Sequence, residues 1–190
     1  MTVFYKYGFA FLWIAYCVYY WIKSLDVKAS KQTESMPSRL IRAIAILSAI
    51  ALLAIQNMPL GPLDRRITSY TKTCFWTGFV LAAAGLLFSV WARLHLGSNW
   101  SRAVTIKQDH ELITSGPYAF VRHPIYTGLL TGFIGSALAL NKWRGIVAVI
   151  LVFIVLWYKL RLEEKWMRSR FGGAYESYSK QVAVLFPYLL

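Results

Sequence analysis

The sequence predicts an all-α integral membrane protein with about five transmembrane helices. Of its 190 residues, 57% are hydrophobic and only 15% are charged, and the mean hydropathy is +0.47. Soluble domains carry about 25% charged residues. Several apolar stretches also reach the roughly 20 residues that a membrane-spanning helix needs. An ordinary soluble domain is therefore excluded, and we expect residues 1–190 to form a single membrane domain.

The first three spans are expected at residues 3–22, 39–58 and 73–94, where long apolar runs carry almost no charge. A fourth apolar block, residues 125–160, is interrupted by the sequence NKWRG at residues 141–145. Polar and glycine residues of this kind mark a turn. We interpret the block as a tight hairpin of two helices, which gives five spans in total.

Basic residues are unequally distributed among the segments that these spans separate. With the N-terminus outside, the cytoplasmic segments hold 15 of the 21 lysines and arginines and the other segments hold 6. This bias is the positive-inside signal of membrane proteins. Contact with the anionic headgroups of membrane lipids explains the net charge of +13. We therefore expect no nucleic acid as a partner.

A long polar loop, residues 97–122, precedes the fourth span. It lacks a helical or strand period, and loops longer than about 12 to 15 residues are often functional. It ends in TSGPYAFVRHPIYTG, residues 114–128. Pro117 and Pro124 fix their own backbone and favour extended conformations at Gly116 and His123. The segment is thus predicted to hold a preset shape at the membrane surface, although its tyrosines, and Arg122 as a positive-inside anchor, are also typical of an interface.

Two adjacent glutamates, Glu163 and Glu164, follow the last expected span in a chain with only eight acidic residues. Carboxylates near a membrane are costly unless paired, and they often mark a binding site. Lys159 and Arg161 precede them at helical ion-pair spacing. Adjacent helix residues are rotated by about 100°, so we expect only one glutamate to contact a ligand. Loop and tail together predict a site for a cationic or zwitterionic ligand.

The tail after Lys159 continues the last helix as a polar extension. Gly172 and Gly173 predict the C-terminus of this helix. The aromatic and basic residues from 174 to 186 then predict a short amphipathic helix that lies at the membrane interface. Cys17 and Cys74 fall in predicted spans, far from any metal-ligand spacing, so we expect neither a metal site nor a disulfide.

The sequence HELITSGPYAFVRHPIYTG is followed about 35 residues later by EEKWMRSRFGGAYESYSKQV and a closing FP. These motifs resemble the isoprenylcysteine carboxyl methyltransferase family. The resemblance covers residues 97–190, and residues 1–96 match only in being hydrophobic. It implies a scaffold half and a catalytic half, with S-adenosyl-L-methionine as cofactor, enclosed by the loop and the tail. A lipophilic substrate would enter from the bilayer between helices.

The resemblance also implies roles for individual residues. The cofactor would contact His110, Glu111, Leu112, Ile113, Tyr118, His123, Pro124, Ile125, Tyr126 and Glu163. The catalytic candidates are Lys159, Arg161 and Glu164. In the family pattern an arginine four positions before the first glutamate faces the substrate carboxylate. This chain has Lys159 there, a point charge instead of a planar fork, which makes Arg161 the substitute candidate.

The expected function is methyl transfer from S-adenosylmethionine to a membrane-embedded, lipid-like acceptor, foremost the carboxylate of a prenylcysteine-like substrate. A phospholipid amine N-methyltransferase is the first alternative, in which His123 or Glu164 would act as base. A sterol-type membrane reductase with a nicotinamide cofactor, and a non-catalytic transporter or scaffold, are weaker alternatives. The active site is expected to face the cytoplasm.

Overall fold

The computed structural model describes residues 2–24, 35–55, 59–97 and 112–187. Within these ranges the chain is helical, and its only strand-like features are two isolated bridges. This confirms the predicted all-α class. The helices are α1 (Thr2–Lys23), α2 (Met36–Ala54), α3 (Lys72–Leu96), α4 (Pro124–Leu140), α5 (Trp143–Phe171) and α6 (Gly173–Gln181), with the 3-10 helices η1 (Gly61–Asp64) and η3 (Gly116–Ala119).

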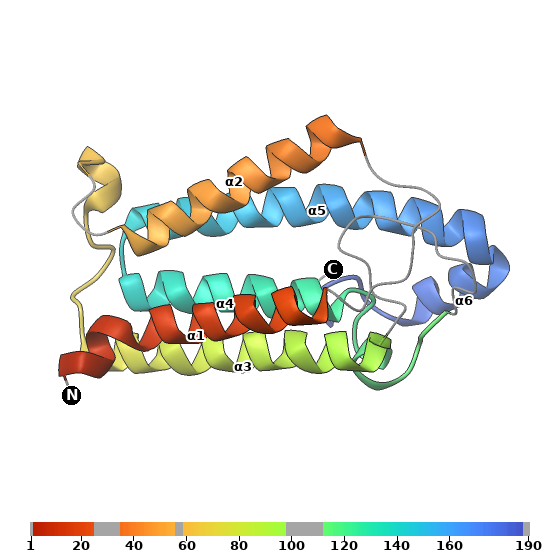
Figure 1. Ribbon diagram of the computed structural model, residues 1–190, viewed down its shortest axis with the longest axis horizontal. Helices are drawn as coiled ribbons and strands as arrows, with labels where there is room; N and C mark the ends of the chain where they lie inside the picture. The colour runs from red at the N-terminus through yellow and green to blue at the C-terminus, as the bar shows by residue number, and fades with distance from the viewer. Residues whose placement is uncertain (1, 25–34, 56–58, 98–111, 188–190) are drawn as a thin grey trace.

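The five long helices form an up-and-down bundle (Figure 1). Helix α4 packs against α3 on one side and against α5 on the other, α2 packs on α5, and α1 rests on α3. The turn between α4 and α5 lies with η1 at one end of the bundle. The start of α4, the end of α5 and α6 lie at the opposite end (Figure 1), which we call the α6 end.

Three helices, α2, α3 and α5, are long and apolar enough to cross a membrane. Helix α4 has 17 residues, a length of about 26 Å at 1.5 Å per residue, slightly less than a 30 Å bilayer core. Helix α1 has 22 residues but is rich in tyrosine and tryptophan, which favour the membrane interface. The hairpin is confirmed, because Asn141 ends α4 in a left-handed conformation. That all five helices span stays a prediction.

Helices α3 and α4 approach closely along a seam of glycines. Gly78 and Gly85 of α3 face Gly135 and Gly128 of α4, with a spacing of seven residues in each helix. A Cβ atom added to Gly85 would lie 2.7 Å from the carbonyl oxygen of Gly128, a distance at which atoms clash. Small residues allow membrane helices this close approach. The seam thereby fixes the start of α4 relative to α3.

Polar contacts attach α1 to this pair. The hydroxyl of Ser89 on α3 lies 2.8 Å from the hydroxyl of Tyr16 and 2.9 Å from that of Tyr20. The indole of Trp13 donates a 3.0 Å hydrogen bond to Ser136 of α4. Buried polar groups are costly unless hydrogen-bonded. These pairs therefore position α1 where its tyrosines and tryptophan find partners.

Ion pairs secure the end of the bundle opposite to α6. Asp64 of η1 accepts a 2.7 Å hydrogen bond from Lys142 in the α4–α5 turn and lies 3.1 Å from Nε of the buried Arg144. The amide of Asn141 donates to the carbonyl of Thr68 at 2.8 Å. These contacts join the segment before α3 to the hairpin.

Candidate functional site

The loop before α4 reaches the α6 end through η3. Gly116 begins this turn with a φ of 59°, so the predicted extended conformation at this residue is wrong. Only glycine adopts this conformation readily, and the ring of His95 from α3 also excludes a side chain, since a Cβ on Gly116 would lie 2.7 Å from its Cε1 atom. His95 also lies 2.9 Å from the hydroxyl of Ser115 through Nε2. Pro124 begins α4 as its first residue, as its position predicts.

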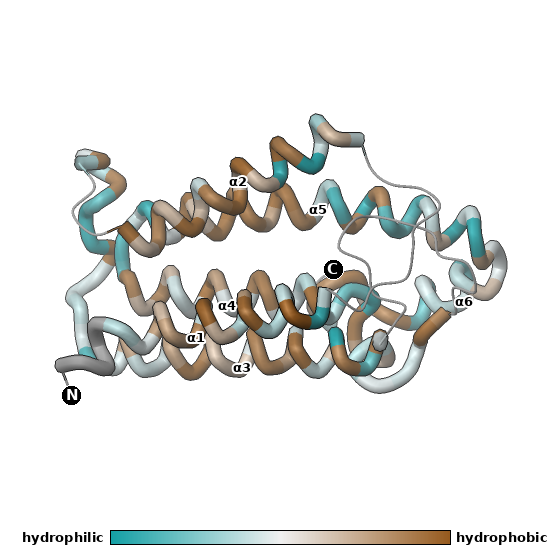
Figure 2. Tube along the Cα trace, viewed as in Figure 1, coloured by the Kyte–Doolittle hydropathy of each residue, from teal (hydrophilic) through white to brown (hydrophobic). Residues whose placement is uncertain are grey.

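Helix α5 extends well beyond its apolar part, and Figure 2 shows the change to hydrophilic residues toward α6. It ends at Gly172, whose φ of 50° matches the predicted glycine cap. Helix α6 begins at Gly173 and ends at Gln181, so the predicted helix over 174–186 is wrong in its last third. Residues 182–186, which we call the strap, leave the helix instead.

The strap runs beside the start of α4. Val121 and Ala183 form a parallel bridge. The backbone amides of Arg122 and His123 donate to the carbonyls of Ala183 and Val184 at 2.8 and 3.1 Å. Amides that precede a helix have no partner within it, and the carbonyls of the strap provide these partners. Leu185 of the strap is fully buried against the protein. The location of residues 174–186 at the membrane interface stays a prediction.

Glu163 brings together three other predicted site residues at the α6 end. The hydroxyl of Tyr126 donates a 2.6 Å hydrogen bond to its Oε1. The ammonium of Lys159 lies 3.6 Å from the same oxygen and 5.1 Å from the centre of the Tyr126 ring. His123 Nδ1 lies 3.6 Å from Oε2. The Glu163 side chain is 23% exposed, so it is partly accessible to a ligand.

Glu164 has a different environment, buried with its side chain 8% exposed. Arg122 donates through Nε to Oε1 at 2.7 Å, and Tyr175 of α6 donates to the same oxygen at 3.3 Å. Arg168, one turn later on α5, donates to Oε2 at 3.3 Å. The predicted pairing of Glu164 with Arg161 is wrong: Arg161 is exposed on α5, and Arg168, four residues after Glu164, is the helical partner instead.

His123 lies between the two carboxylates. Its Nδ1 faces Glu163 Oε2 at 3.6 Å, and its Nε2 faces Glu164 Oε1 at 3.5 Å. Its ring stacks on that of Tyr126, with 5.5 Å between centres and 6° between planes. The two glutamates diverge, as their positions on a helix require. One imidazole nevertheless touches both.

Three buried tyrosines lie near these groups, and two of them, Tyr175 and Tyr178, donate hydrogen bonds. Burial raises the pKa of Tyr175, and the neighbouring Glu164 carboxylate raises it further. Burial, partly offset by the Arg122 cation, raises the pKa of Tyr178 to about 12. Burial likewise raises the pKa of Tyr118. The phenols therefore stay protonated near neutral pH, and Tyr178 donates a 2.6 Å hydrogen bond to the carbonyl of Tyr118.

The structure describes the remaining predicted cofactor residues only in part. His110 and Glu111 lie outside the described residues. Leu112 and Ile113 are half-buried in the segment before η3, and Pro124 and Ile125 are buried and half-buried in the first turn of α4. Their proposed contacts with a cofactor stay predictions.

Sequence reasoning missed the residues that hold the site together. Arg122 was interpreted as a membrane anchor, but its side chain is 8% exposed and bound to Glu164. Arg168, Tyr175 and the strap were also not assigned to the site. The available signal was the scarcity of acidic residues, since a buried arginine and a buried glutamate in such a chain need each other.

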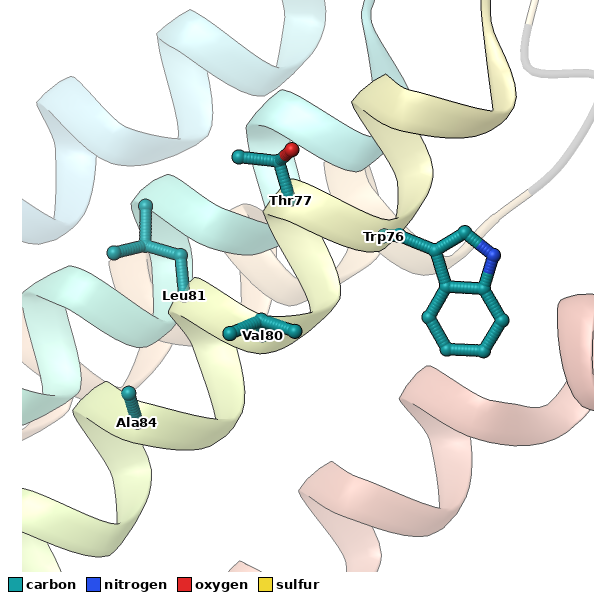
Figure 3. A pocket seen from close by; sticks show the side chains of 5 residues that line it. All are labelled: Trp76, Thr77, Val80, Leu81 and Ala84. Carbon is teal, nitrogen blue, oxygen red and sulfur yellow. The ribbon is translucent and has the colours of Figure 1, made fainter.

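Other parts of the described chain offer no comparable cluster. An apolar hollow on the outer surface of α3 is lined by Trp76, Thr77, Val80, Leu81 and Ala84 (Figure 3). It carries no titratable side chain and lies in the N-terminal half of α3, away from the α6 end. No group of three or more metal-ligating side chains occurs in the ranges that the structure describes.

Comparison with known proteins identifies the family. Residues 73–174, more than half of the chain, match the family model described as phospholipid methyltransferase. The chain belongs to this family. The matched region contains η3, residues 122–124, α4 and the whole of α5, and therefore most residues of the site. The missing parts are the strap and most of α6.

Curated relatives support the resemblance to isoprenylcysteine carboxyl methyltransferases. The chain is 36% identical over 97 residues to protein-S-isoprenylcysteine O-methyltransferase of Schizosaccharomyces pombe, covering 48% of this chain and 40% of the relative. It is 33% identical over 135 residues to the Saccharomyces cerevisiae protein of that name, covering 66% and 55%. The chain thus spans about half the length of the curated relatives that it matches.

A solved structure has a similar fold. It is the eukaryotic intramembrane Ras methyltransferase called isoprenylcysteine carboxyl methyltransferase, which is 25% identical and aligns with a TM-score of 0.56. The alignment covers 82% of this chain and 54% of that one. With the apolar helices, this match identifies an integral membrane protein, and it confirms the family resemblance that the motifs predict.

Proposed function

We propose that the chain is a membrane methyltransferase that uses S-adenosylmethionine and modifies a lipid-like acceptor, foremost the carboxylate of a prenylcysteine-like substrate. The observation that carries the proposal is the partly exposed Glu163 carboxylate beside Tyr126, Lys159 and His123 at the α6 end. The names of the curated relatives support the same reaction class.

The surroundings of Glu163 suit the amino end of the methionine moiety. Its Oε2 lies 3.6 Å from His123 Nδ1, too far for a hydrogen bond, so this oxygen retains capacity to accept from an ammonium group. The face of Tyr126 already has the cation of Lys159 over it, and aromatic faces attract cations. When bound, S-adenosylmethionine supplies a methyl group on a positively charged sulfur.

The residues of the chain would then act by position and charge. A carboxylate acceptor is ionised at neutral pH, so it needs no base. Lys159, whose ammonium lies over the Tyr126 ring, would attract this carboxylate. Correct alignment of two reactants contributes about 7 to 11 kcal/mol in well-oriented cases. Glu164 is saturated by Arg122, Arg168 and Tyr175, and we assign it to holding the site instead of moving a proton.

A phospholipid amine is the second candidate acceptor, favoured by the description of the matching family model. An amine acceptor must lose a proton before it attacks. His123 is the group that would accept it, because its imidazole lies between Glu163 and Glu164. The first turn of α4 would then serve as both cofactor wall and base.

The distribution of basic residues supports a cytoplasmic α6 end. The cofactor is water-soluble and would enter from that side. The lipophilic acceptor would enter from the bilayer between helices, so the two reactants would meet at the level of Tyr126. Membrane lipids are the remaining partners that we propose.

A transfer assay separates the candidates. The purified protein is incubated with methyl-labelled S-adenosylmethionine and a membrane lipid extract, and the labelled product is treated with base. Loss of the label indicates a methyl ester and a carboxylate acceptor, whereas a stable label indicates an amine. A lipid product from the wild type but not from Glu163→Gln supports the proposed site. The absence of any labelled lipid, together with binding of NADPH, would favour the reductase instead.

A further inference from the structure

Arg122 binds three separate parts of the chain at once. Its Nε donates to Glu164 Oε1 of α5 at 2.7 Å. Its Nη1 donates to the carbonyl of Ser179 in the last turn of α6 at 2.7 Å and also to the carbonyl of Val182 at the start of the strap. The side chain is 8% exposed. A membrane anchor would instead keep its guanidinium in the headgroup region.

The contacts of Arg122 suit the end of a helix. The last carbonyls of a helix lack partners within it and carry a partial negative charge. Ser179 lies in the last turn of α6 and Val182 follows it, so the guanidinium caps this end. The backbone amide of the same residue holds Ala183 of the strap. Side chain and backbone together therefore fasten α6 and the strap to the start of α4.

The Arg122 guanidinium also reaches the proposed cofactor carboxylate through one intermediate. Arg122 Nε and His123 Nε2 face the same oxygen of Glu164, at 2.7 and 3.5 Å. The opposite nitrogen of His123 faces Glu163 at 3.6 Å. If Glu164 rotates, the imidazole loses one of its two flanking carboxylates, and its orientation toward Glu163 changes.

We propose that Arg122 is a positioning residue that couples docking of α6 and the strap on the start of α4 to the orientation of His123 toward Glu163. The inference rests on the proposed function, because it concerns how the same site holds its cofactor. Arg122 itself touches neither Glu163 nor the face of Tyr126. Its effect on a ligand passes through Glu164 and His123.

Hydrogen exchange tests the docking of the strap on the start of α4 without any ligand. The amides of Arg122 and His123 donate to strap carbonyls, so their exchange rates report whether the strap is docked. We expect Arg122→Met to accelerate exchange at these two positions, and Arg122→Lys to do so less. Lys165→Met, which removes an exposed cation from the same part of α5, is the matched control and should leave both rates unchanged.

Calorimetry with S-adenosylmethionine then tests the coupling. Residues within one contact network have non-additive effects on binding. We therefore expect Arg122→Met to weaken binding by about fivefold or more in the wild-type background, and by clearly less in the Glu163→Gln background. A residue that only stabilises the fold would weaken binding equally in both, so equal losses would overturn the proposal. Thermal unfolding in detergent is measured first for the wild type, Arg122→Met, Glu163→Gln and the double variant. The titrations are then run at a temperature at which all four proteins are folded.

Failure of the proposed function and failure of the proposed role of Arg122 give different results. If the wild type does not bind S-adenosylmethionine, the proposed function fails and the coupling fails with it. If the wild type binds but Arg122→Met keeps its affinity, only the role of Arg122 is overturned. Unchanged exchange at residues 122 and 123 in Arg122→Met would likewise show that Arg122 does not hold the strap on the start of α4.

Discussion

The phenol of Tyr126 donates a 2.6 Å hydrogen bond to the carboxylate of Glu163. This contact links the first turn of α4 to the polar extension of α5. Hydrogen bonds to charged groups contribute about 1.5 to 3 kcal/mol, so Tyr126→Phe should weaken S-adenosylmethionine binding by about tenfold or more. Calorimetry measures this directly. Tyr158→Phe, which changes an exposed tyrosine of the same helix as Glu163, should bind normally, and equal affinities in the two variants would contradict the assignment.

Lys159 and Arg161 differ in their positions although both are catalytic candidates. Lys159 lies 3.6 Å from Glu163, whereas Arg161 is exposed. If Lys159 attracts an anionic acceptor, Lys159→Met should lower the rate of transfer by about tenfold or more while cofactor affinity changes little. Arg161→Met should have the smaller effect. Initial rates at saturating cofactor decide between them, and a larger loss in Arg161→Met would reverse the assignment.

The glycine seam predicts a change in stability from a residue that has no contact with the predicted ligand. Gly85→Ala places a methyl group 2.7 Å from the Gly128 carbonyl, and overpacking of this kind costs about 1 to 3 kcal/mol. Thermal unfolding in detergent should show a lower midpoint than the wild type. Gly173→Ala is the control, because nothing lies within 4 Å of the added atom. If both variants unfold like the wild type, the two helices do not pack as closely as described.

Cysteines placed at the two ends of the bundle should differ in their labelling by an impermeant reagent in cells. Lys142 lies in the α4–α5 turn and the exposed Lys180 lies on α6 (Figure 1). In a background with Cys17→Ser and Cys74→Ser, an impermeant thiol reagent should label Lys142→Cys in intact cells. It should label Lys180→Cys only after the membrane is opened. The reverse pattern would place the site on the outer side and invert the topology inferred from the basic residues.

Local signals in the sequence predicted most of the architecture. Apolar runs and the NKWRG turn located the long helices, because burial in a bilayer requires uninterrupted hydrophobic length. Gly172 and Pro124 marked a helix end and a helix start for reasons of backbone conformation that act within a few residues. Similarly, the spacing of Lys159 and Glu163 predicted a contact within one helix.

Long-range contacts were not predictable in the same way. Arg122 and Glu164 are 42 positions apart, and either residue alone fits an exposed role. The strap was predicted as part of a helix because residues 174–186 as a whole carry aromatic and basic side chains. Tertiary pairing with the amides before α4 decided otherwise, as context often overrides local propensity. The glycines of the seam are small residues in apolar helices, and only the packed pair reveals their alignment.

The central claim is that Glu163, and not its neighbour, binds the cofactor's ammonium group. Calorimetric titration of S-adenosylmethionine into the Glu163→Gln and Glu164→Gln proteins tests it most directly, with Glu176→Gln on the exposed face of α6 as control. A lost charge-assisted hydrogen bond predicts roughly ten- to a hundredfold weaker binding for Glu163→Gln. Glu164→Gln should chiefly lower the unfolding temperature, since it leaves the buried Arg122 without its ion pair. Full cofactor affinity in Glu163→Gln, with loss in Glu164→Gln in a folded protein, would contradict the account.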